Sequence, residues 1–248
     1  MNKPCGLTEE ELEAIIIDDV EQDRSVLTEE TTGDSPHGIN ENTLIYSDEL
    51  KQAALLSRPA QEELSPKRVF LGERTKRYTL VLDLDQTLVH SSEVHPRTSG
   101  TEGVCSFAVK VRPFVSKLLE QMSKIFELVV FTAAEEVYAK PVVGIIDPEN
   151  KYLKKVICRQ NCIQTPQGFL VKDLRIFADR EVNEILIVDD NVLSFAFQLA
   201  NGIPILPFNG EEEDDELNYL MEYLNEIYEE KDLIKVNREK IGLVPVEQ

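Results

Sequence analysis

The sequence predicts an α/β fold in which a central, mostly parallel β-sheet is flanked by helices. Apolar runs at residues 80–82, 126–131 and 185–188 contain β-branched residues and are too short to be core helices. Each run is followed by polar residues that can carry chemistry. Segments with helical periodicity separate the runs, as expected where crossover helices join parallel strands.

The first run belongs to the stretch YTLVLDLDQTLVH at residues 78–90, which places Asp83, Asp85 and Thr87 at its end. Ligands of open α/β sheets bind beyond the carboxyl ends of the strands. Alternate residues of a strand point the same way, so Asp83 and Asp85 can face one substrate. Close carboxylates repel each other unless a cation such as Mg²⁺ neutralises them or one keeps a proton. The alternative is a plain turn in which Asp85 and Thr87 cap backbone groups.

The next two runs also end in candidate site residues. The run at 126–131 is followed by Thr132, whose hydroxyl and free N–H at a helix start would suit a phosphate oxygen. The alternative is an ordinary helix N-cap, with Glu135 three residues on. The third run ends in Asp189 and Asp190. Adjacent residues of an extended strand point to opposite sides, so we expect at most one of these two to reach a metal directly.

The remaining elements follow from periodicity and from turn-forming residues. We expect a loop over 91–103 and strands at 105–111, 154–157 and 202–206. Helices are predicted from Pro113 to Met122, over 135–147 with a break at Pro141, and over 195–199. After the acidic run 211–216, an apolar helical stripe is predicted to cover the sheet; its residues are Leu217, Leu220, Met221, Leu224, Ile227 and Tyr228.

The charge and the composition exclude several classes of partner. The net charge is −20, and residues 1–76 and 211–248 each carry −9 of it. Such a chain is repelled by nucleic acid and by anionic membranes, and no apolar run is long enough to span a bilayer. Without a secretory signal, we expect a nuclear or cytoplasmic monomer with reduced cysteines. Cys158 and Cys162 are four residues apart but have no histidine at ligand spacing, so we expect thiols rather than a zinc site.

The motif DLDQTLVH, with Asp83, Asp85 and Thr87, resembles the D-x-D-x-T signature of the haloacid dehalogenase superfamily of aspartate-dependent phosphatases. More narrowly it resembles the FCP/SCP branch, whose members act on the C-terminal domain of RNA polymerase II, together with their small-domain relatives. That branch usually has Glu at the position of Gln86. The resemblance continues through LVVFTAA, GFLVKDL, EILIVDDN and FQLANGIPI and covers residues 77–208.

The resemblance implies a Rossmann-like haloacid dehalogenase fold with a small insertion after the first strand and no large cap. We place the phosphatase domain at residues 69–235. An acidic, largely disordered extension is expected at 1–68, where 29–42 is rich in turn formers, and a loose tail at 236–248.

The resemblance also assigns roles to the catalytic residues. Asp83 is the expected nucleophile and Asp85 the expected general acid and base. Thr87, Thr132 and Lys172 are expected to hold phosphoryl oxygens. A lone lysine is usually a solvated surface charge, but Lys172 lies in the K-D-L element of the family.

Magnesium is the expected cofactor. The resemblance implies that Asp83, the backbone carbonyl of Asp85 and the side chain of Asp190 bind Mg²⁺, while Asp189 supports the site. The expected substrate is a phosphoserine or phosphothreonine peptide, with the RNA polymerase II C-terminal domain as one candidate. The alternative is a binding protein, similar to a mitochondrial import receptor of this branch that uses the fold without the full catalytic set.

Overall fold

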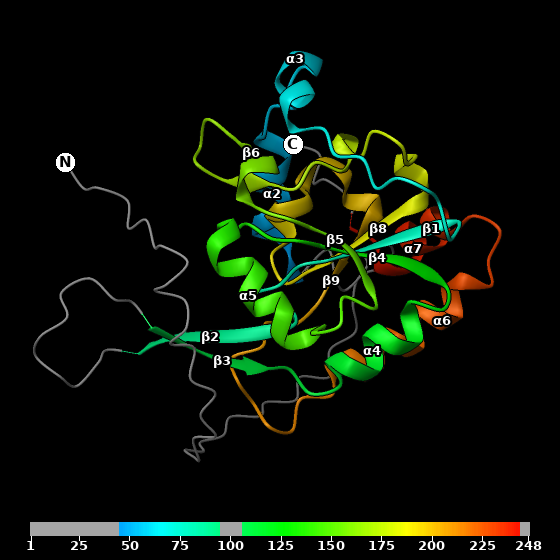
Figure 1. Ribbon diagram of the computed structural model, residues 1–248. Coiled ribbons are helices and arrows are strands. Elements are labelled where there is room, and N and C mark those ends of the chain that lie inside the picture. The colour runs from blue at the N-terminus through cyan, green and yellow to red at the C-terminus, as the bar shows by residue number, and fades with distance from the viewer. Residues whose placement is uncertain (1–44, 95–105, 244–248) are drawn as a thin grey trace, which may run out of the picture.

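The computed structural model describes residues 45–94 and 106–243. Its centre is a five-stranded sheet in which every neighbouring pair is parallel, in the order β5-β4-β1-β8-β9. The strands are β1 (Tyr78–Leu82), β4 (Phe126–Phe131), β5 (Leu153–Ile157), β8 (Ile185–Asp189) and β9 (Gly202–Pro204). The predicted α/β class and the parallel sheet are confirmed, and β1 occupies the middle of the sheet (Figure 1).

Alternating side chains of the sheet divide the core into two layers. Leu80 and Leu82 of β1 pack on one side, whereas Val81 packs on the other. The first side is covered by α4 (Val115–Met122), α5 (Glu136–Ile146) and α6 (Glu216–Tyr228). The second side is covered by α2 (Ser47–Leu55) and by the 3₁₀ segments η4 (Leu174–Ile176) and η6 (Val192–Asn201). Because the sheet is buried on both faces, its strands are almost continuously apolar.

Several helices and strands differ from the prediction. The segment β2 (Val89–Val94) pairs antiparallel with β3 (Ser106–Val111), so the predicted loop over 91–103 begins as a strand. The sequence of β2 is polar and has no apolar pattern that would predict a strand. This strand forms through its pairing with β3. The segment predicted as a regular helix over 195–199 is the kinked η6, with non-helical backbone at Phe195 and Gln198.

The helix α5 runs through Pro141 without the predicted break. Proline lacks the N–H that the carbonyl four residues earlier would accept, which weakens a helix at that point. The buried residues Ala139, Val142 and Val143 lie on both sides of Pro141 and pack into the core. This packing holds the helix together across the proline, and it places the first turn of α5 next to the end of β4.

The described parts of the expected extension and of the expected tail contain helices. In the expected extension, α2, α3 (Gln61–Leu64) and η2 (Ser65–Lys67) are helical, and Leu50 and Leu64 are fully buried. In the expected tail, α7 (Leu233–Ile241) continues beyond residue 235. Residues 1–44, which include most of the predicted extension and Cys5, lie outside the described residues, as do 95–105 with Cys105 and 244–248.

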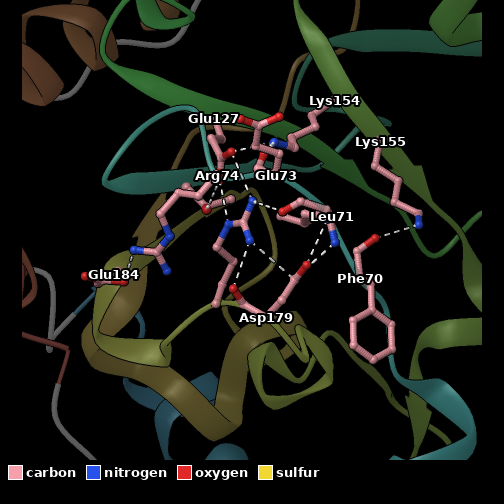
Figure 2. A network of polar contacts seen from close by, with 12 residues as sticks. Phe70, Leu71, Glu73, Arg74, Glu127, Lys154, Lys155, Asp179 and Glu184 are labelled. Atoms are coloured by element: carbon pink, nitrogen blue, oxygen red, sulfur yellow. Dashed lines mark hydrogen bonds and ion pairs between the residues drawn. The ribbon is translucent and has the colours of Figure 1, made fainter.

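A polar network fixes the chain where it enters β1 (Figure 2). The side chain of Asp179 accepts hydrogen bonds from the backbone N–H groups of Leu71 and Gly72, at 3.0 and 2.8 Å. Glu127, near the start of β4, accepts from the backbone N–H of Thr75 at 2.9 Å. It also pairs with Lys154 at 2.6 Å, and Figure 2 shows these two side chains meeting from neighbouring strands. This network lies at the opposite ends of the strands from Asp83.

Candidate active site

The carboxyl ends of β1, β4 and β8 bring together four of the predicted residues, Asp83, Thr132, Asp189 and Asp190. They line a cavity of about 490 Å³ at that edge of the sheet. The parallel pairing explains this convergence, because β1 lies between β4 and β8 and all three strands end at the same edge. Asp85 and Lys172 line the same cavity.

Lys172 lies directly between two of these carboxylates. It follows the short strand β7 (Leu170–Val171), and its backbone N–H donates to the carbonyl of Ser194 at 2.6 Å. Its ammonium donates to Asp83 Oδ1 and, at 2.6 Å, to Asp189 Oδ2. Lys172 is only 2% exposed. The surface-charge alternative for this lysine is therefore wrong, and Lys172 is part of the cluster.

The electrostatics of the cluster show an excess of negative charge. Burial, together with the charge of Asp189, raises the pKa of Asp83 to about 7, although Lys172 opposes this shift. Burial and Asp189 also raise the pKa of Asp190, to about 6. Burial by itself would lower the pKa of Lys172, but the two carboxylates outweigh it and raise that pKa. One ammonium therefore does not neutralise the group.

The carboxylates fit a divalent cation. Asp83, Asp189 and Asp190 each offer one oxygen, and these oxygens all lie within 4.8 Å of one another. The buried hydroxyl of Ser194, which also lines the cavity, has no hydrogen-bond partner within the described residues. Hard oxygen ligands with uncompensated negative charge are the donors that Mg²⁺ prefers.

Both carboxylates of the 189–190 pair lie close to Asp83, with an oxygen of each within 4.8 Å of an Asp83 oxygen. The expectation that at most one of the two binds a metal directly stays a prediction. The strand ends at Asp189, and the N–H of Asn191 turns back to Asp189 Oδ1 at 2.9 Å. The pair is therefore no longer extended, and both carboxylates can approach one point.

Asp85 occupies the rim of the cavity. Its Oδ1 accepts hydrogen bonds from the hydroxyl of Tyr138 and, at 3.4 Å, from the hydroxyl of Ser91. Burial raises the pKa of Asp85, and the two hydrogen bonds partly oppose that effect. The side chain of Asp85 is not in the group of three carboxylates around Asp83, so its contribution to metal binding would come from its backbone carbonyl, as the resemblance implies.

Thr132 lines the cavity but is not the cap of a helix. Its backbone N–H donates to the carbonyl of Ile157 at 2.9 Å, so the expectation of a free N–H is wrong. Its Oγ1 accepts from the N–H of Ala134 at 3.0 Å. The N-cap of α5 is Glu135, one residue before the helix begins at Glu136. The Thr132 hydroxyl therefore retains its own proton for donation to a ligand in the cavity.

Thr87 is the one predicted phosphate-binding residue that the structure does not bring to the cavity. Its side chain is fully buried, and its hydroxyl has no hydrogen-bond partner within the described residues. A tight turn causes this placement. The N–H groups of Leu88 and Val89 both bond to the carbonyl of Leu84, and Gln86 adopts a φ of 62°. The turn keeps Gln86 in the cavity lining and takes Thr87 out of it.

Among the residues at the cavity that the sequence prediction missed are Tyr138, Ser194 and Arg159. Ser194 and Arg159 line the cavity, and Tyr138 reaches it through Asp85. The position of Tyr138 was the available signal, because a helix that starts just after a strand end presents its first turn to the same edge of the sheet. The two cysteines agree with the prediction: Cys158 and Cys162 are buried free thiols, and burial raises the pKa of each to about 11.

The fold and the site define an α/β protein with a carboxylate-rich centre at the carboxyl edge of a parallel sheet. The particular family follows from its sequence. The chain belongs to the NLI interacting factor-like phosphatases, whose family model matches residues 78–234. This membership confirms the resemblance to the FCP/SCP branch.

Individual relatives carry corresponding names. CTD small phosphatase-like protein 2 of Dictyostelium discoideum is 34% identical over 210 residues, covering 82% of this chain and 35% of that protein. CTD small phosphatase-like protein 3 of Caenorhabditis elegans is 36% identical over 180 residues, covering 68% of this chain and 62% of that protein. The human CTD small phosphatase-like protein is 30% identical over 207 residues, covering 80% of this chain and 72% of that protein. The chain thus spans about a third of the first relative and under two thirds of the second.

Proposed function

We propose that this chain is a Mg²⁺-dependent protein serine/threonine phosphatase that works through an aspartyl-phosphate on Asp83. The observation that carries the proposal is the buried cluster in which Lys172 joins Asp83 to Asp189 beside Asp190. A carboxylate held by a buried cation, at an open cavity with spare negative charge, suits attack on a phosphate bound through a metal ion.

The reaction has two steps. First, a carboxylate oxygen of Asp83 attacks phosphorus, the bond from phosphorus to the serine or threonine oxygen breaks, and Asp85 gives its proton to that leaving oxygen. Then Asp85 takes a proton from water, which attacks the phosphorus of the aspartyl-phosphate. This releases inorganic phosphate and regenerates Asp83.

The surrounding groups position and neutralise the phosphoryl oxygens. Lys172 supplies a fixed positive charge beside Asp83, and the Thr132 hydroxyl supplies a hydrogen-bond donor. Mg²⁺ would be held by Asp83, Asp190 and the backbone carbonyl of Asp85, with Asp189 beside it, and would offset the charge of the phosphate. Thr87 has no direct part, because it lies outside the cavity.

The proposed substrate is a phosphoprotein. The relatives are named as phosphatases of this kind, and one is the human carboxy-terminal domain RNA polymerase II polypeptide A small phosphatase 1, which is 30% identical over 175 residues. Between β1 and α4, the described residues form no strands or helices besides the small β2–β3 pair. An extended peptide such as the polymerase tail is therefore a reasonable candidate. No helix in residues 45–94 or 106–243 combines the length and the apolar character that crossing a bilayer requires.

A binding protein without turnover is the competing function. It would bind its partner whether or not the partner is phosphorylated, and this binding would not depend on a metal ion. The full set of Asp83, Asp85, Thr132, Lys172 and Asp190 at one cavity supports the enzyme.

The test is a phosphopeptide panel assayed with Mg²⁺ and with a chelator. We expect release of phosphate from phosphoserine or phosphothreonine peptides with Mg²⁺ and none with the chelator. Asp83→Asn should reduce turnover at least about a thousandfold. Asp48→Asn, which changes an exposed carboxyl on α2, is the matched control and should keep full activity. Turnover by a folded Asp83→Asn protein would refute the nucleophile, and Mg²⁺-independent turnover would refute the cofactor.

A further inference from the structure

Two hydroxyl groups converge on one oxygen of Asp85. Tyr138, in the first turn of α5, donates its hydroxyl to Asp85 Oδ1, and Ser91 of β2 donates to the same atom at 3.4 Å. Within the described residues, these are the side-chain hydrogen bonds that the carboxylate accepts. The other oxygen, Oδ2, is therefore the one left for a substrate.

The position of the Tyr138 hydroxyl is fixed by packing. Its ring meets the ring of Phe107 from β3 edge-on, with centroids 5.8 Å apart and an angle of 73° between the planes. The next residue of α5, Ala139, is fully buried in the core. The Tyr138 ring thus packs on Phe107 and, partly buried, against the core, so its hydroxyl presents a well-defined donor to Asp85.

Asp85 is held differently from the other carboxylates of the cavity. Asp83 and Asp189 are oriented by the ammonium of Lys172. Asp85 is oriented by Tyr138 and Ser91, which come from α5 and from the β2–β3 pair rather than from the sheet. The orientation of the Asp85 side chain thus depends on α5 and on β2, two elements outside the central sheet.

We propose that Tyr138 is a positioning residue for Asp85: its hydroxyl holds Oδ1 so that Oδ2 faces the leaving oxygen of the substrate. The inference rests on the proposed function, in which Asp85 protonates that oxygen. A catalytic acid must lie within hydrogen-bond reach of the atom it protonates. Loss of the Tyr138 hydroxyl lets the carboxylate turn away, which weakens only the steps in which Asp85 transfers a proton.

This role predicts dependence on the leaving group. A serine oxygen leaves as a strongly basic alkoxide and needs a proton in the transition state, whereas p-nitrophenolate is a weak base and needs little help. The quantity to compare is kcat/KM, which reports steps only up to release of the leaving group. Later hydrolysis of the aspartyl-phosphate is common to both substrates and does not enter it.

The experiment measures kcat/KM of wild type and Tyr138→Phe on a phosphoserine peptide and on p-nitrophenyl phosphate. This substitution keeps the ring against Phe107 and removes only the hydroxyl. We expect a loss of about tenfold or more on the peptide and a much smaller loss on p-nitrophenyl phosphate, since general acid catalysis contributes about 10²–10⁴-fold. The amino acid O-phosphoserine, which has no flanking residues, should show the same fold loss in kcat/KM as the peptide. This comparison separates an effect on proton transfer from an effect on peptide binding.

Two further variants keep the result interpretable. Val137→Ala changes the exposed neighbour on the same helix and should leave both substrates unaffected. In an Asp85→Asn background, Tyr138→Phe should no longer distinguish the substrates, because the two residues act as one unit.

Equal losses on both substrates, or a selective loss that persists in the Asp85→Asn background, would overturn the role of Tyr138. If wild type hydrolyses neither substrate with Mg²⁺, the proposed function itself fails instead. The two failures therefore give different results.

Discussion

Two buried ionic clusters lie at opposite ends of the central strands, and they are balanced in opposite ways. At the carboxyl end, Asp83 and Asp189 share the ammonium of Lys172, and the carboxylate of Asp190 lies beside them. At the amino end, one carboxylate, Glu127, pairs with two cations, Arg180 at 2.6 Å and Lys154 at 2.6 Å. Figure 2 shows the side chains of Glu127 and Lys154. Asp83, Asp189 and Lys172 are buried, as are Glu127 and Arg180, so the main difference between the clusters is the balance of their charges.

The pKa values record this difference. Burial alone would raise the pKa of Glu127, but hydrogen bonds from Arg180, Lys154 and the backbone of Thr75 lower it to about 2. At the other end, the pKa of Asp83 rises to about 7. A carboxylate that is fully paired stabilises the fold, whereas a group with spare negative charge is arranged to bind a cation or a phosphate-bound metal. Burial of charge therefore does not by itself mark an active site.

The largest expected effect is a loss of folding stability when the cluster at the amino end is changed. Glu127→Gln removes the charged partner of Lys154 and leaves Arg180 with its longer, 3.5 Å ion pair with Asp179. We expect a loss of about 3–5 kcal/mol in the free energy of unfolding. Urea denaturation measures this loss. The folded fraction should keep its activity on p-nitrophenyl phosphate, because the cluster lies at the far end of the strands. A drop in kcat without a loss of stability would break the comparison.

The second effect is on catalysis. Lys172→Met removes the ammonium beside Asp83 and should lower kcat on a phosphopeptide by about 10²–10³-fold, the usual result of losing one fixed electrostatic group. Steady-state kinetics with saturating Mg²⁺ measures it. The control is Lys124→Met, which removes an exposed lysine on the surface pair with Glu120. If Lys172→Met retains wild-type kcat, the cation is structural and the two clusters do not differ in kind.

The smallest effect is a pH dependence of stability at the amino end. The pKa of Glu127 is about 2 in the folded protein and 4.5 in a free glutamate, so the unfolded chain binds the proton more readily. The stabilisation is therefore complete above about pH 4.5 and is lost as the pH falls towards 2. Thermal unfolding of wild type across this range should show the loss, and Glu127→Gln should show less of it. Parallel curves for the two proteins would contradict the assignment.

The carboxyl end was largely predictable from the sequence because its residues follow directly from strand ends. Asp83, Thr132 and Asp189 each come just after or at the end of an apolar run, and parallel pairing makes such ends meet. Lys172 was predictable only through its family motif. The turn that buries Thr87 was not, since it depends on a left-handed Gln86 that pattern alone does not reveal.

The amino end was not predictable, and the reason is physical. Glu127, Lys154 and Arg180 come from distant parts of the chain and have no characteristic spacing. Glu127 also lies inside an apolar run, and the residues near it in the sequence do not predict which cations it pairs with. Tyr138 was not predicted at the site for the same reason. Its contact with Asp85 spans 53 residues and depends on how α5 packs beside β4.

The central position of β1 has a consequence for the order in which the protein is made. Ribosomes synthesise β1 first among the sheet strands, but its neighbour β8 and the lysine that joins their carboxylates come much later. Domains fold as units once their long-range partners are available. Asp83 is therefore synthesised 89 residues before Lys172, and a chain truncated before β8 has no assembled centre at all.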